Sequence, residues 1–208
     1  MRLIEWALLT VTLVVEPTLA GQAYDQLYRQ YDYPKTLHRA SVPVCLHHGC
    51  ERVERVKLSD EHWNRLVAYF TPAAQNAEEE RAQIRQAIAE MERITGGLAG
   101  TAGDIGGDLG GIGTFDPQMD CIDESSNTTT YLTLFDQAEM LRWHSVEPVI
   151  SRGYLFIGGW PHYTARIRDK QTGEQWVVDS WFRDNGELPD VLDLDTWKDG
   201  WKPEGFTF

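Results

Sequence analysis

The chain has 208 residues, of which 42% are hydrophobic and 25% charged, so it can form one domain with a core, or one domain plus an extension. Its formal net charge of −13 argues against binding to nucleic acid or to anionic lipid, because no basic surface is available to neutralise phosphates. Solubility is a sufficient explanation of this charge.

The first twenty residues resemble a secretory signal peptide. Arg2 supplies a positive start, residues 3–15 are mostly apolar, and residues 17–20 end in small side chains. The apolar run is short for a membrane span. We expect a cleaved signal peptide over residues 1–20 and a soluble mature protein that is periplasmic or secreted, with an uncleaved anchor as the alternative.

Residues 21–57 are predicted to be an N-terminal extension that wraps on a main domain over residues 58–208. The extension contains Cys45 and Cys50, which would close a small disulfide loop in an oxidising compartment. The third cysteine, Cys121, is then a candidate reactive thiol.

A metal site is the rival explanation of the cysteine pair. His47 and His48 lie between the two cysteines, and these four ligand types suit zinc. The segment is too short for four tetrahedral ligands, so we favour the disulfide and expect no metal there.

Two helices are predicted before the glycine-rich middle of the chain. The first opens at Ser59 and is ended by Thr71-Pro72. The second is capped by Asn76 with Glu79 at the capping-box position, and we expect Gly96-Gly97 to end it.

The segment from Gly96 to Gly113 is dense in glycine and includes Asp104 and Asp108. Its spacing matches neither a phosphate-binding loop nor a calcium loop. A flexible linker is one interpretation. We favour a long loop beside an active cleft, because the segment leads directly to Cys121 and loops of this length inside a domain are usually functional or disordered.

A helix is predicted from about Cys121 to Leu141. Asp120 is a good N-cap, and Asp123 completes something close to a capping box. Cys121 would be the first helical residue, where the helix dipole favours a thiolate, the form that acts as a nucleophile. The plain alternative is a buried cysteine that acts as a small hydrophobe. His144 is expected at the C-terminal end of this helix.

Two strands are predicted further on, over residues 160–168 and 176–181, joined by a turn at residues 169–174. If the loop between them has four residues, His162 lies directly opposite Asp179, with the Cβ atoms about 5 Å apart. A register moved by two residues would leave the pair diagonal on one face, whereas a shift by one would separate them. The tail beyond the second strand should pack back on the domain, with Trp197 in the core or in a lid.

Cys121, His162 and Asp179 together supply the roles that cysteine chemistry needs. A thiolate attacks a carbonyl, an imidazole takes and returns a proton, and a carboxylate orients the imidazole. An oxyanion hole would use the backbone N–H of Cys121, with the Gln118 side chain as a second candidate donor.

The order of these residues resembles the transglutaminase-like superfamily. Asp120-Cys121-Ile122-Asp123 is similar to the Asp-Cys-x-Asp of bacterial transglutaminase-like cysteine peptidases. His162-Tyr163-Thr164-Ala165 and Val177-Val178-Asp179-Ser180-Trp181 resemble the His and Asp strands of that family, and the resemblance covers roughly residues 78–181.

The resemblance implies an α+β fold with a papain-like core, in which the nucleophile helix packs on an antiparallel sheet and further helices lie N-terminal to it. It also implies attack on an amide of a protein or peptide substrate, by hydrolysis or by acyl transfer. Acids beside the nucleophile bind calcium in some members, so calcium is a possible ligand and no other cofactor is expected. A cell-wall peptidase resembling the NlpC/P60 group and a non-catalytic envelope binding protein remain alternatives.

Overall fold

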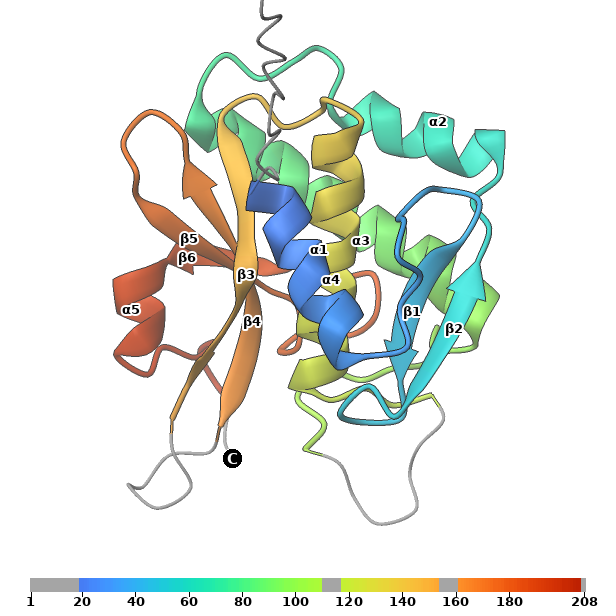
Figure 1. Cartoon of the computed structure of the whole chain (residues 1–208). Coiled ribbons are helices and arrows are strands. Elements are labelled where there is room, and N and C mark those ends of the chain that lie inside the picture. Colours follow the sequence, from blue (N-terminus) through green and yellow to red (C-terminus); the bar gives the residue numbers. More distant parts are fainter. Residues whose placement is uncertain (1–18, 110–116, 154–160, 207–208) are drawn as a thin grey trace, which may run out of the picture.

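The computed structural model describes residues 19–109, 117–153 and 161–206, so the predicted signal peptide lies almost wholly outside the described residues. The described residues form an α+β fold, as predicted, with a two-stranded and a four-stranded antiparallel sheet (Figure 1). The helices are α1 (Leu19–Gln30), α2 (Asp60–Tyr69), α3 (Ala77–Ala99), α4 (Cys121–Gln137) and α5 (Leu194–Lys198). The strands are β1 (Val42–Leu46), β2 (Arg52–Val56), β3 (His144–Arg152), β4 (His162–Asp169), β5 (Gln175–Asp179) and β6 (Asp190–Asp193). None of the helices in this part of the chain is long and apolar enough to cross a membrane.

The central element is α4, which lies between the two sheets (Figure 1). One side contacts β3 and β4 of the four-stranded sheet, whose order is β3-β4-β5-β6, and another contacts β1. Residues 123–135 of α4 are all buried, although many are serine or threonine. Thr130 and Thr133 donate their hydroxyls to the carbonyls of Ser126 and Thr129, each at 2.8 Å, which satisfies these polar groups inside the core.

The segment predicted as an extension, residues 21–57, contributes α1, β1 and β2. Leu27 of α1 and Val44 of β1 are buried in the same hydrophobic cluster as Leu132 of α4 and Val146 of β3. Residues 21–57 therefore pack into the same core as the rest of the fold.

The predicted helix starts are confirmed for α2 and α3. The Ser59 hydroxyl accepts the backbone N–H of His62 at 3.1 Å, and the Asn76 side chain accepts that of Glu79 at 2.9 Å. These side chains replace the partners that the first turn of a helix lacks.

The prediction that Gly96-Gly97 ends α3 is wrong. The helix continues to Ala99, and Gly100 follows in the left-handed conformation with φ of 90°. Gly96 instead allows a close approach, because a Cβ atom there would lie 2.7 Å from the side-chain oxygen of Asn185. The glycine is explained by packing inside the helix and not by its termination.

The pairing of β4 with β5 differs by two residues from the register that we predicted. Arg168 pairs with Gln175 and not with Gly173. The turn is longer than four residues because Asp169 folds it back: its N–H bonds to the Glu174 carbonyl at 2.8 Å, and its carbonyl accepts the Gly173 N–H at 2.9 Å. The strands β3 and β6, which flank this pair, were not predicted.

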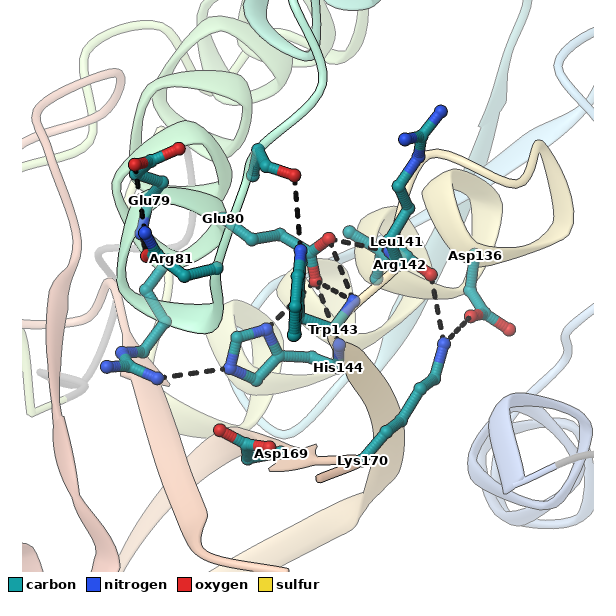
Figure 2. Close-up of polar contacts among 12 residues, drawn as sticks. Glu79, Glu80, Arg81, Asp136, Leu141, Arg142, Trp143, His144, Asp169 and Lys170 are labelled. Atoms are coloured by element: carbon teal, nitrogen blue, oxygen red, sulfur yellow. Dashed lines mark hydrogen bonds and ion pairs between the residues drawn. The ribbon is translucent and has the colours of Figure 1, made fainter. Parts of the chain in front are cut away.

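A buried carboxylate on α3 holds the start of β3 in place (Figure 2). Glu80 accepts the backbone N–H groups of Arg142 at 2.6 Å, Trp143 at 3.0 Å and His144 at 2.9 Å. Its Oε1 also lies 2.9 Å from Nδ1 of the His144 ring. The hydrogen bonds of Glu80 thus join α3 to the first strand of the four-stranded sheet.

The predicted C-terminal end of the Cys121 helix, with His144 beside it, is wrong. α4 ends at Gln137, and the chain leaves the helix through Glu139, which has a left-handed φ of 58°. Leu141 therefore lies outside the helix, and His144 is the fully buried first residue of β3.

Candidate active site

Cys121 is the first residue of α4, as predicted. The Asp120 carboxylate accepts the N–H groups of Ile122 and Asp123, both at 3.0 Å, and Asp123 accepts the N–H of Asp120 in return at 3.3 Å. The predicted capping box is therefore present. The cap uses the N–H groups of the second and third helical residues and not that of Cys121.

The Cys121 side chain is 7% exposed and lines a cavity of about 270 Å³. The walls of this cavity include Asp108, Asp120, Pro161, Tyr163 and Trp181. The sulfur lies 4.0 Å from the Pro161 carbonyl, directly before β4. A small group that enters the cavity can therefore reach the thiol.

Burial raises the pKa of the Cys121 thiol to about 12. The backbone N–H of Tyr163 lowers this pKa, whereas the charges of Asp120 and Asp179 raise it further. The shift is opposite to the one that the helix dipole alone predicts, because removal of a thiolate from water outweighs the dipole. The resting group is a neutral thiol, which needs a base before it can attack.

His162 and Asp179 meet as a buried pair. Nε2 of His162 lies 2.7 Å from Oδ2 of Asp179, and the two residues are 2% and 1% exposed. The residues are diagonal across β4 and β5 and remain on one face of the sheet, which the predicted alternative register allows. Nδ1 of His162 has no hydrogen-bond partner among the described residues. One ring nitrogen is therefore held by the carboxylate and the other is available.

Aromatic side chains connect the imidazole with the thiol. The His162 ring centroid lies 4.8 Å from that of Trp181 and 5.1 Å from that of Phe182. Cys121 belongs to the same buried cluster as these two aromatic residues. His162 and Asp179 are therefore in direct contact, whereas Cys121 is linked to His162 through Trp181 and Phe182, and no hydrogen bond joins the sulfur to the imidazole among the described residues.

Gln118 lies directly before this site and holds the glycine-rich loop. Its side-chain oxygen accepts the N–H of Ile105 at 3.2 Å, and its amide nitrogen donates to the Gly103 carbonyl at 3.1 Å. These contacts give Gln118 a structural role, and its function as an oxyanion donor stays a prediction.

The predicted disulfide between Cys45 and Cys50 is present. All four residues from His47 to Cys50 have a positive φ, between 57° and 68°. The loop therefore turns tightly and directs successive backbone N–H groups towards one side.

Those N–H groups bind the start of α4. His48 and Cys50 donate to the two oxygens of Asp123, each at 2.7 Å, and Gly49 donates to Asp120 at 2.9 Å. The disulfide loop is thus attached to the two carboxylates of the α4 capping box.

Three further acids are buried behind the site. Asp104 accepts the N–H of Met119 at 2.7 Å, and Glu124 accepts the hydroxyl of Ser180 at 2.9 Å. Burial raises the pKa of Asp104 and of Glu92 to about 8, and that of Glu124 well above its usual range. Burial therefore favours the protonated form of each of these three acids.

The acids considered for calcium do not converge on one point. Within residues 19–109, 117–153 and 161–206, one set of three candidate ligand atoms lies within 4.8 Å of one another, and it is Cys45, Cys50 and Asp123. The two sulfurs of this set are joined in the disulfide. Asp108 contacts Nε2 of His48 at 2.9 Å. Calcium binding stays a prediction.

Sequence reasoning missed one polar contact of the site. Trp197 is buried, as predicted, but its indole N–H also donates to Oδ2 of Asp179 at 2.8 Å. No sequence signal indicates this contact, because it depends on how α5 folds back on β5.

Comparison with known proteins adds no identification: no family model, curated protein or solved structure matches this chain. The resemblance to transglutaminase-like cysteine peptidases therefore rests on the short sequence motifs and their order, and it stays a prediction.

Proposed function

We propose that this chain is an exported cysteine hydrolase or acyltransferase that acts on peptide or isopeptide amide bonds. Cys121 is the nucleophile, His162 the general base and acid, and Asp179 the orienting carboxylate, as in the transglutaminase-like peptidases that the motifs resemble. The observation that carries the proposal is the 2.7 Å contact between His162 Nε2 and Asp179 Oδ2, which leaves Nδ1 without a described partner. The disulfide is compatible with export.

The chemistry begins from the neutral thiol. As the sulfur forms a bond with the substrate carbonyl carbon, the S–H proton passes to His162 Nδ1 and the carbonyl oxygen becomes an oxyanion. The intermediate collapses, the C–N bond breaks, and the amine leaves with that proton. Water or a second amine then attacks the thioester, transfers its proton through His162 and releases the Cys121 thiol.

Oxyanion stabilisation falls to the start of α4. The Asp120 cap does not use the Cys121 N–H, which lies at the positive end of the helix dipole. Such donors at a preorganised position contribute much of the rate enhancement in acyl transfer.

A non-catalytic envelope binding protein is the second candidate, and burial of the Cys121 thiol favours it. A binding protein has no need of a reactive cysteine, and a raised pKa of about 12 suits an inert one. A cell-wall peptidase of the NlpC/P60 type would use the same three catalytic roles and differ in substrate.

An acylation experiment separates the candidates. We would incubate the protein with p-nitrophenyl acetate at about pH 7, follow release of nitrophenolate, and locate the acetyl group by mass spectrometry. The proposal predicts an acetyl thioester on Cys121 that is lost in Cys121→Ser and in His162→Ala, with His38→Ala, an exposed histidine outside the site, as the matched control. Added primary amine would capture the acetyl group if transfer competes with hydrolysis. Absence of acetylated Cys121 in the wild type would contradict the proposal and support the binding protein.

A further inference from the structure

The Asp179 carboxylate has a second donor besides His162. Oδ2 accepts the imidazole at 2.7 Å and the Trp197 indole N–H at 2.8 Å. Asp179 is 1% exposed and Trp197 is fully buried, whereas Oδ1 has no partner within the described part of the chain. Both hydrogen bonds described for the Asp179 carboxylate therefore end on Oδ2, one from His162 and one from Trp197.

Trp197 is held in place by its own helix and by Arg152. It lies on α5, whose N-cap Asp193 accepts the N–H of Thr196 at 2.8 Å. The Arg152 guanidinium, from the end of β3, lies 4.4 Å from the centroid of the Trp197 ring. Arg152 also donates to the Trp197 carbonyl and, at 2.6 Å, to the Trp201 carbonyl. The indole is therefore fixed before any substrate arrives.

A fixed neutral donor has a definite effect on a buried carboxylate. It stabilises the charged form, which burial alone disfavours, and it fixes the direction in which Oδ2 accepts. The Arg152 charge, 4.4 Å from the centroid of the Trp197 ring, attracts the Asp179 charge. A carboxylate held in this way keeps the proton of the neutral imidazole on Nε2, so that Nδ1 carries the lone pair.

We propose that Trp197 is a positioning residue of this site, which holds Asp179 through its indole N–H so that His162 presents a basic Nδ1 to the Cys121 thiol. The inference rests on the proposed function for its consequence in catalysis, but the tautomer that it predicts can be measured without any activity.

The test replaces the indole nitrogen and little else. Trp197→Phe removes the N–H, and incorporation of 3-benzothienylalanine at position 197 replaces it with sulfur while it keeps the size of the ring system. Trp143→Phe is the matched control, because it also loses an indole hydrogen bond, from Nε1 to the Ala74 carbonyl at 3.2 Å, at a distance from the site. The benzothienyl variant keeps the test valid if Trp197→Phe does not fold.

Two readouts are needed. Nitrogen-15 NMR of His162 should show a mainly Nε2–H tautomer in the wild type and a shift towards Nδ1–H in both position-197 variants. The rate of Cys121 acetylation should fall about tenfold, the expected effect of one buried hydrogen bond, and its pH profile should move with the tautomer.

The outcomes distinguish the two proposals. If the position-197 variants match Trp143→Phe in tautomer and in pH profile, the positioning role is wrong. If the wild type does not acetylate but the tautomer shifts as expected, the proposed function fails and the positioning of His162 by Trp197 stands.

Discussion

His162 and Asp179 form a hydrogen bond of 2.7 Å although they are not opposite partners in the sheet. They lie diagonally across β4 and β5, and the imidazole reaches the carboxylate along one face. The bond therefore depends on the register of the two strands as well as on the two residues.

Asp179→Asn should leave the fold intact and remove most of the activity. The amide can donate to Nε2, which would place the imidazole proton on Nδ1 and leave no base for the thiol. We expect the acetylation rate of Cys121 to fall about 100-fold or more. Asp199→Asn, an exposed substitution of the same kind, should change the rate by less than about twofold. A wild-type acetylation rate in Asp179→Asn would show that Asp179 has no catalytic role.

Glu80→Gln should destabilise the protein at neutral pH. Burial raises the pKa of Glu80, but hydrogen bonds from His144 and from the backbone N–H groups of Trp143 and Arg142 lower it by more, so the net shift is downward (Figure 2). A lowered folded-state pKa stabilises the protein above the usual glutamate pKa, and this contribution is lost as the pH falls through the folded-state value.

The expected cost of Glu80→Gln is about 2–4 kcal/mol at pH 7, since the charged acceptor is lost from a buried network. Urea unfolding should show the difference from wild type shrinking as the pH falls below the usual glutamate pKa. Glu78→Gln, exposed in the same helical turn, should cost less than about 0.5 kcal/mol. A cost of Glu80→Gln that is small or independent of pH would contradict this account.

Loss of the disulfide should affect both stability and the site. Closure of the short loop between Cys45 and Cys50 is expected to contribute about 2 kcal/mol. The N–H groups of this loop also donate to Asp120 and Asp123 at the start of α4. Acetylation of Cys121 should therefore be slower in the Cys45→Ala/Cys50→Ala variant. Reductant should lower the stability of the wild type and leave that of the double variant unchanged. Equal rates with and without the disulfide would show that the loop does not support the site.

The cavity over Cys121 should discriminate by charge. Asp108 and Asp120 line it, and its described lining includes no lysine or arginine. The quantity to measure is the alkylation rate with neutral iodoacetamide divided by the rate with iodoacetate. This ratio should be about tenfold larger for Cys121 than for a free thiol in solution, because like charges repel. Asp108→Asn should reduce this ratio. Equal relative rates would mean that the carboxylates do not act on an entering group.

Local signals predicted the parts of the fold that depend on neighbours in sequence. Ser59, Asn76 and Asp120 cap their helices as predicted, because the side chain and the N–H groups that it accepts lie within three residues. The disulfide followed from the short separation of Cys45 and Cys50.

Features that depend on contacts between distant segments were missed. Gly96 was expected to end a helix, but it lies inside α3, where the close approach of the Asn185 side chain leaves no room for a Cβ atom. His144 was expected at the end of the Cys121 helix, but it is the first residue of β3, where its ring contacts Glu80 of α3. The contact of Trp197 with Asp179 and the burial that raises the pKa of Cys121 likewise require the assembled fold.

The most direct test of the central claim is the pH dependence of Cys121 alkylation by iodoacetamide, in wild type and in His162→Ala, with mass spectrometry to confirm that Cys45 and Cys50 stay unlabelled. In His162→Ala the rate should rise about tenfold per pH unit through about pH 10 without a plateau, because the pKa of about 12 keeps the thiolate scarce. Wild type should add a faster reaction near neutral pH, because His162 takes the thiol proton as the sulfur reacts. Profiles that superimpose would contradict a Cys121–His162 nucleophile and would leave Cys121 as a buried structural thiol.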